Sequence, residues 1–318
     1  MQVSPVAKPT VPSPAGQIRI ANFNVENLFD LVDDPKHEDE RTTPTAKVYE
    51  NKLAKISLAL RDTLAGADIV ALNEVENQTV LDDLLAQPAM QGLGYKSVLI
   101  EGNDLRGIDN AFLYRADRVT LDSVSNPNIK APKGMPNSGG QIDNTLLFAR
   151  EPLVATFSLT GAKQAAEGAA QITLIGNHFK SKAGEDNNKG ERRIEQGKFV
   201  AGLVDDLRAK TPGANVIVIG DLNSLPGEQP LDEIAKHKDG TDRMFDTPNK
   251  LPEADRYTYI FDGNKNLLDH VFVTPELHEK VTKVEIPHIN SGGHSDTKDP
   301  TTPNHSSDHD PIITTIQL

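Results

Sequence analysis

Hydrophobic and polar positions follow two periods along this chain, one of two residues and one of three to four. Runs rich in Ile, Val and Leu predict strands over residues 18–25, 68–72, 95–100, 110–114, 146–159, 171–177, 215–219, 267–273 and 312–316. Apolar residues three and four positions apart predict helices over residues 49–64, 79–85 and 191–210. Strands that alternate with amphipathic helices are typical of an α/β fold.

Two other segments lack either period and are expected to be loops. Residues 121–143 are rich in Asn, Pro and Gly, and residues 288–310 are almost entirely polar. No internal repeat and no shift in composition divides the remainder of the chain. We therefore expect a single domain over residues 17–318.

The first 16 residues contain four prolines and no hydrophobic stretch of signal-peptide length, so they are predicted to form a flexible leader. The compartment is open at this point. If Met1 replaces a removed signal peptide, the protein is secreted or periplasmic; otherwise it is a cytoplasmic protein with a loose tail. No segment approaches the roughly 18 apolar residues of a membrane helix, so we expect no stable membrane association.

Composition narrows the chemistry. There are 46 acidic and 33 basic residues, which gives a formal net charge of −13 and argues against a protein that coats nucleic acid. An enzyme can still bind phosphates locally through divalent cations and a few Lys and Arg side chains. The absence of cysteine excludes disulfides, Cys-ligated zinc, iron–sulfur clusters and thiol nucleophiles.

Polar side chains recur where predicted strands end or begin, and ligands of α/β sheets collect at strand ends. These side chains are Asn24, Glu74, His178, Asp221, Asn223, Asp269, Asp308 and His309. Carboxylate and amide oxygens suit Mg²⁺, Mn²⁺ or Ca²⁺ better than a structural zinc. Each residue taken alone also has an ordinary interpretation. Glu74 fits a solvated charge, the Gly-Asp-Leu-Asn segment a turn, and His178 a histidine bonded near the core.

The chain resembles the endonuclease/exonuclease/phosphatase superfamily from about Gln17 to Leu318. The segments that carry the resemblance stand in the family's order: ANFNVENLF, DIVALNEVEN, RGIDNAFLYR, FAREPLVATF, GNHFKSK, VIVIGDLNS, LLDHVFVT and SSDHDPI. The closest branch is similar to bacterial, often secreted, nucleases of the deoxyribonuclease-I type. The resemblance implies a four-layer α/β/β/α sandwich of two mixed sheets, with one cleft across the top.

The resemblance also implies metal and catalytic roles. Asn24, Glu74 and Asp308 would bind the principal divalent metal, with Mg²⁺ the first expectation and Mn²⁺ or Ca²⁺ the alternatives. Asp221 and Asn223 would position the attacking water and the phosphate, and help to hold a second metal.

Proton transfer is assigned in the same way. His309 would take the proton of the water, oriented by Asp269. His178 would bind the phosphate or protonate the leaving oxygen, with Glu101 as its carboxylate partner. The chemistry is consistent, because a divalent cation stabilises the charge that develops on the phosphoryl oxygens and acidifies a bound water.

Basic residues near these segments are the candidates for substrate binding. Arg150 stands where the family places a phosphate-binding arginine, and Arg106 is a second candidate. Lys180 and Lys182 flank His178, and both a contact with substrate phosphates and a solvated position stay open for them. The expected substrate is DNA, RNA or both, and the protein is expected to act as a monomer.

Four other functions are alternatives to a nuclease. A phosphoinositide phosphatase is disfavoured because residues 257–270, YTYIFDGNKNLLDH, lack that group's signature. A sphingomyelinase-like lipid phosphodiesterase would share the catalytic residues but should carry an exposed aromatic hairpin for membrane docking, which we do not expect in a chain with no Trp and 5 Tyr. An abasic-site repair enzyme stays open. A catalytically inactive binding protein is disfavoured because every expected polar residue is present.

Overall fold

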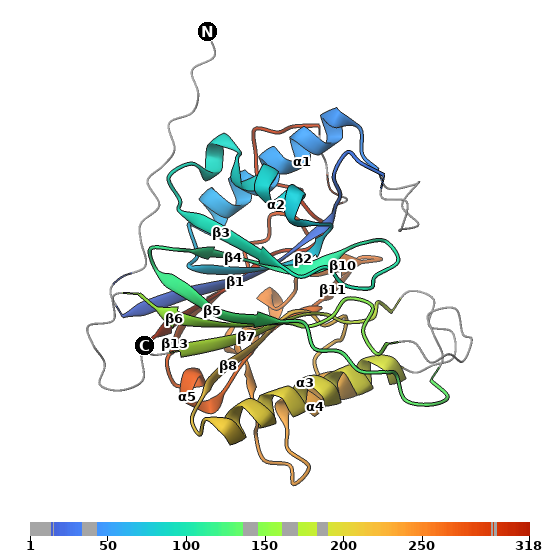
Figure 1. Ribbon diagram of the computed structural model, residues 1–318, viewed down its shortest axis with the longest axis vertical. Coiled ribbons are helices and arrows are strands. Elements are labelled where there is room, and N and C mark those ends of the chain that lie inside the picture. Colours follow the sequence, from blue (N-terminus) through green and yellow to red (C-terminus); the bar gives the residue numbers. More distant parts are fainter. Residues whose placement is uncertain are drawn as a thin grey trace.

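Two six-stranded mixed sheets lie face to face in the computed structural model, with helices on both outer faces (Figure 1). The structure describes residues 14, 16–33, 43–135, 146–160, 171–182, 190–293, 295 and 298–318. This arrangement confirms the predicted four-layer α/β/β/α sandwich. Most of the predicted leader lies outside the described residues.

The first sheet has the strand order β13-β14-β1-β2-β4-β3. Its strands are β13 (Val281–Glu285), β14 (Ile312–Gln317), β1 (Gln17–Leu28), β2 (Ile69–Val75), β4 (Asp109–Arg115) and β3 (Tyr95–Leu99). Only β1 and β2 pair in parallel; the other neighbours in this sheet are antiparallel. The carboxyl ends of β1 and β2 therefore meet at one edge.

The second sheet repeats this pattern of directions in the order β5-β6-β7-β8-β12-β9. Its strands are β5 (Val119–Ser125), β6 (Leu153–Leu159), β7 (Gln171–His178), β8 (Asn215–Asp221), β12 (Asp269–Val273) and β9 (Phe245–Asp246). Here β7 and β8 form the parallel pair, and the other neighbours are antiparallel. Each sheet thus has one central parallel pair.

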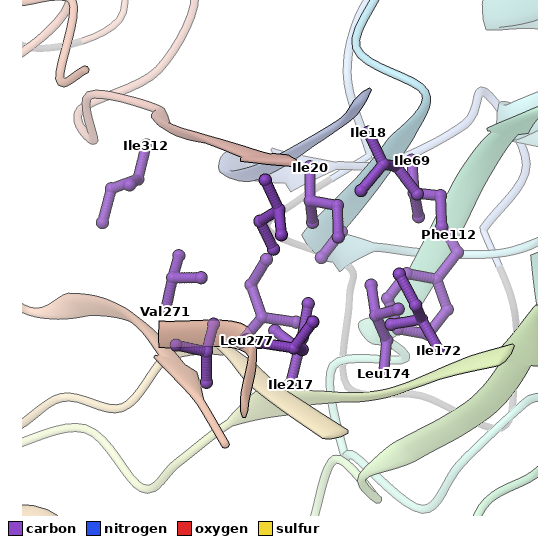
Figure 2. Packing of buried hydrophobic residues seen from close by; sticks show 14 of the residues in the cluster. Ile18, Ile20, Ile69, Phe112, Ile172, Leu174, Ile217, Val271, Leu277 and Ile312 are labelled. Atoms are coloured by element: carbon purple, nitrogen blue, oxygen red, sulfur yellow. The ribbon is translucent and has the colours of Figure 1, made fainter. Parts of the chain in front are cut away.

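The main hydrophobic core fills the space between the two sheets. Figure 2 shows side chains of the first sheet facing side chains of the second, among them Ile18, Ile20, Ile69, Phe112, Ile312, Ile172, Leu174, Ile217 and Val271. Alternate residues of each strand point to this core, and the intervening residues pack under the helices in two further clusters. Because both faces of the central strands are buried, β2, β7 and β8 are mainly apolar through their middle, and their polar residues gather at the carboxyl ends.

Helices cover the outer face of each sheet (Figure 1). On the first sheet lie α1 (Ala46–Leu58), its π-helical continuation η1 (Ala59–Thr63), and α2 (Gln78–Leu85). On the second lie α3 (Glu191–Lys210) and α4 (Gln229–Ala235). Thr45 and Asn77 cap α1 and α2, since their side-chain oxygens accept from the backbone amides of Val48 and Val80. None of the helices in the described ranges is both long and apolar enough to traverse a bilayer.

The remaining elements are short. They are α5 (Pro275–His278), the 3-10 turns η2 (Pro88–Met90), η3 (Thr247–Lys250) and η4 (Glu253–Asp255), and a hairpin of β10 (Tyr259–Phe261) and β11 (Asn264–Asn266). The hairpin stands outside both sheets.

The predicted buried strands and the helices are present, and two segment predictions were wrong. Residues 121–143 were expected to be a loop, but β5 occupies 119–125 as an edge strand whose side chains are largely accessible, so it lacks an apolar run. The strand predicted over 146–159 begins only at Leu153, directly after Pro152, which has no N–H to donate to a ladder. Residues 136–145 lie outside the described part.

Candidate active site

The two parallel strand pairs bring four of the predicted site residues to one end of the sandwich. In the β1–β2 pair Asn24 lies beside Asn73, the residue before Glu74, and in the β7–β8 pair His178 lies beside Asp221. Carboxyl ends of parallel strands share one edge, so the sheet geometry alone places these side chains together.

Hydrogen bonds join the residues of the two sheets at this end. Nδ2 of Asn24 donates to Oε1 of Glu74 and to Oδ2 of Asp221, both at 3.2 Å. Nε2 of His178 is 3.7 Å from the same two oxygens. Asn24, His178 and Asp221 are buried, and Glu74 is partly buried. Two carboxylates, an amide and an imidazole therefore converge on one small volume.

His309 enters the same volume from the end of the polar loop that precedes β14. Its Nδ1 is 2.7 Å from Oδ2 of Asp269, and its Nε2 is 3.9 Å from Oδ2 of Asp221. Asn22 donates to the other oxygen of Asp269 at 2.9 Å, which fixes that carboxylate. The predicted pairing of His309 with Asp269 is thus formed, with Nε2 directed toward Asp221.

Asp308 and His309 are held in place by Ser307. The hydroxyl of Ser307 donates to the carbonyl oxygen of Asn24 at 2.7 Å and accepts from the amide of His309 at 3.1 Å. The adjacent Asp310 accepts hydrogen bonds from Asn290, Ser291 and the His288 ring. Ser307 thus ties the polar segment to β1, and His309 ties it to Asp269 in β12 of the second sheet.

The Gly220-Asp221-Leu222-Asn223 turn requires an unusual backbone. Gly220 has φ +140°, and a Cβ built there would lie 1.9 Å from the carbonyl oxygen of Asn177, so only glycine fits. Asn223 has φ +47°; its amide donates to Oδ1 of Asp221 at 2.9 Å and its Nδ2 to the carbonyl oxygen of Phe179 at 3.2 Å. The turn thus fixes Asp221 and Asn223 relative to the end of β7.

Positive φ also occurs at the end of the first sheet's parallel pair, at Glu26 (53°), Asn27 (47°) and Glu74 (66°). The amide of Asn27 donates to Oε2 of Glu74 at 2.8 Å, and that of Glu26 to Oδ1 of Asn24 at 2.9 Å. Non-glycine residues in this region are uncommon and concentrate at functional sites. The strained backbone orients the carboxylate of Glu74.

Burial shifts the pKa values of the carboxyl groups upward. Burial raises the pKa of Asp221 from 3.8 to about 7, and the Asp269 and Glu74 charges add to this while His309 opposes it. Burial also raises the pKa of Asp308, with Glu26 and Glu74 adding to the effect. Carboxylates that are buried together without enough positive charge are typical of sites that bind a cation.

The two histidines shift in opposite directions. Burial lowers the pKa of His178 well below 6.5, and the charges of Arg150, Arg106 and His309 lower it further. Burial acts in the same sense on His309, but Asp269, Asp221 and Asp308 outweigh it and place its pKa well above 6.5. Without a cation His309 is therefore charged at neutral pH and His178 is neutral.

The predicted partner of His178 is not in place. Glu101 is exposed and lies beside the buried Asp109, and Nδ1 of His178 has no hydrogen-bond partner among the described residues. The expected pairing of Glu101 with His178 is therefore not formed. Burial raises the pKa of Asp109 to about 8, and Glu101 contributes to that shift.

The predicted phosphate-binding residues are engaged by the protein. Nη1 of Arg150 is 2.8 Å from Oδ2 of Asp104, and its Nη2 donates to the carbonyl oxygen of Phe179 at 3.0 Å. Nη1 of Arg106 donates to Oδ1 of Asn27 at 3.0 Å, and its side chain is 42% exposed. Arg150 and Asp104 thus form a buried ion pair near His178. The side chain of Arg106 is exposed enough to contact a ligand.

The two lysines after His178 also contact the protein. Nζ of Lys180 donates to the carbonyl oxygen of Ser181 at 3.1 Å, and Nζ of Lys182 is 2.7 Å from Glu228 in a half-exposed ion pair. A phosphate contact from Lys182 has to compete with Glu228.

Sequence reasoning missed an exposed aromatic hairpin at the site. The ring of Tyr259 in β10 lies 4.8 Å from the ring of His309, and Phe261 at the strand's end is 66% exposed. Tyr257, two residues before β10, stacks on the ring of His288 with 3.8 Å between centroids, and Nζ of Lys265 lies 4.0 Å from the centre of the Tyr257 ring. Among the aromatic residues of this hairpin only Phe261 is highly exposed, so it differs from the aromatic membrane-docking hairpin that was not expected in this chain.

A model of the Endonuclease/Exonuclease/phosphatase family matches residues 19–290, most of the chain. The chain belongs to this family. Its members are metal-dependent hydrolases that act on phosphoester bonds, as phosphodiesterases or phosphatases. A search among curated protein sequences gives no match.

Solved structures of family members have the same fold. A mannosyl-6-phosphatase from Bacteroides thetaiotaomicron is 16% identical with a TM-score of 0.61, covering 93% of this chain and 98% of that chain. Truncated TDP2 from Caenorhabditis elegans is 17% identical with a TM-score of 0.60, covering 95% and 98%. The human nocturnin catalytic domain with bound sulfate is 18% identical with a TM-score of 0.56, covering 94% of each chain. At these identities the likeness establishes the fold.

Family members generally use divalent metal ions, and the residues here fit one in part. Glu74, Asp221 and Asp308 supply hard carboxylate oxygens, and burial raises the pKa values of Asp221 and Asp308. In the described residues no three His, Asp or Glu side chains are already arranged as a metal cage. Asn24 also presents its amide N–H to the carboxylates, so coordination through its oxygen requires the amide to turn over. The carboxylates would have to move closer together to hold a cation.

Proposed function

We propose that this protein is a divalent-metal-dependent phosphodiesterase that hydrolyses nucleic acid by in-line attack of a water molecule. The proposal rests on the Asp221 carboxylate, whose Oδ2 is 3.7 Å from Nε2 of His178 and 3.9 Å from Nε2 of His309. Two imidazoles around one carboxylate suit a reaction in which one group accepts the proton of water and the other contacts the phosphate.

In this proposal the cation is held by Glu74, Asp308 and Asp221, with Asn24 and Asn223 as further oxygen donors. When bound, the cation stabilises negative charge on the phosphoryl oxygens and acidifies the attacking water. Asp221 and Asp308 raise the pKa of His309 in the cation-free protein, so with these carboxylates neutralised the imidazole would lose its proton more easily. Nε2 of His309 then accepts the proton of the water, while Asp269 holds Nδ1 and stabilises the imidazolium that forms.

His178 is assigned to the phosphate. Its low pKa leaves the imidazole neutral, with one N–H to donate to a phosphoryl oxygen. Arg106, on the loop after β3, is an accessible cation whose charge acts on His178. Arg150 acts on this site through its charge and its bond to the carbonyl oxygen of Phe179.

The β10–β11 hairpin favours nucleic acid over a lipid bilayer. Membrane docking by a hairpin needs several apolar side chains at its tip. Here the tip residues Asp262, Asn264 and Lys265 are polar, and Phe261 is the one large apolar side chain there with high exposure. A single exposed ring beside a phosphate site suits stacking on a nucleobase.

The first test is a substrate panel with metal removal. With Mg²⁺ the protein should release acid-soluble nucleotides from plasmid DNA or RNA, and excess EDTA should abolish this because the carboxylates then lack the cation. Bis(4-nitrophenyl) phosphate, a sugar phosphate and sphingomyelin are run beside the polymers. If only the monoester or only the lipid were cleaved, the nuclease assignment would be wrong while phosphoester hydrolysis stood.

The second test separates the hairpin from the chemistry. Phe261→Ala should raise KM for single-stranded DNA or RNA about tenfold, because stacking on one base contributes about 1–3 kcal/mol. The same variant should cleave bis(4-nitrophenyl) phosphate at the wild-type rate. Val48→Ala, an exposed apolar residue on α1, is the matched control. Equal losses on the polymer and the small ester would argue against a stacking role.

A further inference from the structure

A lysine is buried beside the acidic end of the first sheet. Lys52 lies in α1, on the outer face of that sheet, and its side chain is 9% exposed. Its Nζ is 3.6 Å from Oε2 of Glu26, the residue two positions after Asn24. Neither residue was among the sequence-predicted site residues.

Three carboxylates face this ammonium group. Burial lowers the pKa of Lys52, and the negative charges of Glu26, Asp308 and Glu74 oppose that lowering. The amide of Asn27, next to Glu26, donates to Oε2 of Glu74 at 2.8 Å, so these two carboxylates lie at the same end of the sheet. The hydroxyl of Ser307, next to Asp308, donates to the carbonyl oxygen of Asn24 at 2.7 Å, which brings Asp308 to that end as well. Oε2 of Glu26 is buried and accepts no hydrogen bond from the described residues.

The burial of Lys52 has to be explained by these charges. A lysine ammonium is rarely taken out of water unless it meets an opposite charge, because its desolvation is unfavourable. The distance of 3.6 Å to Glu26 is too long for a strong hydrogen bond, so Lys52 acts here mainly as a point charge. It provides a positive charge next to carboxylates that belong to the proposed cation site.

We propose that Lys52 is a positioning residue that holds Glu26, Asp308 and Glu74 together before a divalent cation binds, and that it limits how tightly the cation is held. The inference rests on the proposed function, because it needs a divalent cation at these carboxylates. The ammonium offsets repulsion in the cation-free protein, and the same charge repels an arriving cation. Lys52 thereby lowers the affinity of the site for the cation. In return the site is already formed before the cation binds, and the cation can exchange.

Titration of the whole chain with Mn²⁺ by calorimetry tests this inference. Lys52→Met should bind Mn²⁺ about fivefold or more tighter than wild type, because one nearby positive charge is gone. Its melting temperature should fall in EDTA, and saturating Mn²⁺ should restore most of that loss. Lys52→Arg, which keeps the charge, should bind Mn²⁺ nearly as wild type does.

Two variants check the origin of the effect. Lys47→Met removes the same charge from an exposed position of α1 and should leave Mn²⁺ affinity unchanged. Glu26→Gln leaves α1 intact and should weaken Mn²⁺ binding about fivefold or more, because it removes a negative charge from the cluster. It therefore decides the question if Lys52→Met does not fold.

The outcomes are distinguishable. An unchanged or weaker Mn²⁺ affinity in folded Lys52→Met, with the same loss of melting temperature in EDTA and in Mn²⁺, would reduce Lys52 to a packing role and overturn the inference. An unchanged affinity in Glu26→Gln would overturn it as well. If wild-type protein bound no Mn²⁺, the proposed function would fail first, and the inference with it.

Discussion

Replacing His309 with alanine is expected to lower kcat for phosphodiester hydrolysis about a thousandfold, with the protein still folded. The variant loses the imidazole whose Nε2 lies 3.9 Å from Asp221, and general-base catalysis is worth about 10²–10⁴-fold. KM should change little, because His309 acts on the water and not on the substrate. Steady-state rates on DNA and on bis(4-nitrophenyl) phosphate, with circular dichroism as the check of folding, give the measurement.

His305→Ala is the matched control, because His305 is an exposed histidine of the same segment, four residues earlier. It should keep wild-type activity. His178→Ala should also lose orders of magnitude, with its loss divided between kcat and KM because His178 contacts the phosphate. Near-wild-type turnover in His309→Ala would end the assignment of this residue as the base.

The pH profile gives an independent test of the same assignment. His309 must be neutral to accept a proton, so activity should rise with pH on the acidic side. Asp269→Asn removes the negative charge that most strongly opposes the effect of burial, which lowers the pKa of His309. The acidic limb of the profile should therefore move to lower pH while kcat falls. A limb that moved to higher pH would contradict the pairing.

Most of the fold was predictable because its central strands are buried on both faces. β2, β7 and β8 each contain a run of mainly apolar residues, and β1 largely alternates apolar with polar residues; both patterns are visible in a sequence. β5 and β13 were missed for the opposite reason. They are edge strands with polar, accessible residues, and what makes them strands is pairing with a neighbour distant in sequence.

The site was predictable to the extent that it depends on strand ends. Asn24, His178 and Asp221 come together because two parallel pairs end at the same edge. Lys52 and Glu26 were missed, although both left a signal. Lys52 is directly next to Leu53 and four positions before Ile56 on the predicted apolar stripe, and Glu26 is inside the ANFNVENLF segment.

Partners of charged side chains were the least predictable feature. Phosphate binding by Arg150 stays a prediction, and its partner in the structure is Asp104, 46 residues earlier, which the sequence did not indicate. Glu101 was expected to pair with His178 and is exposed instead. The local sequence around an arginine or a glutamate does not show whether its side chain pairs within the protein or points into the site. Only the tertiary arrangement decides which partner lies within reach.

Replacing Asp221 with asparagine is expected to abolish catalysis and, in EDTA, to make the protein more stable than wild type. Burial raises the pKa of Asp221 from 3.8 to about 7, so the folded protein holds a proton that the unfolded chain has released between these values. Stability is therefore lost as pH rises from about 4 to 7, by about 4 kcal/mol at most. Asparagine is neutral throughout and escapes this loss.

Denaturant unfolding at pH 4, 6 and 8 checks the sign. In EDTA, Asp221→Asn should exceed wild type by about 2–4 kcal/mol at pH 8, and the gap should close at pH 4, where both side chains are neutral. Asp206→Asn, an exposed change of the same charge on α3, should show no such gap. A variant less stable than wild type at pH 8 in EDTA would show that the Asp221 charge is already compensated.

Adding Mg²⁺ should reverse the order of the two proteins. Wild type gains stability according to the ratio of free cation to its Kd, whereas Asp221→Asn has lost a charged ligand and gains less. The carboxylate that destabilises the cation-free fold is then the one that makes the bound form stable. The site thus tolerates a poorly compensated charge in the resting protein because the cation, once bound, favours that same charge.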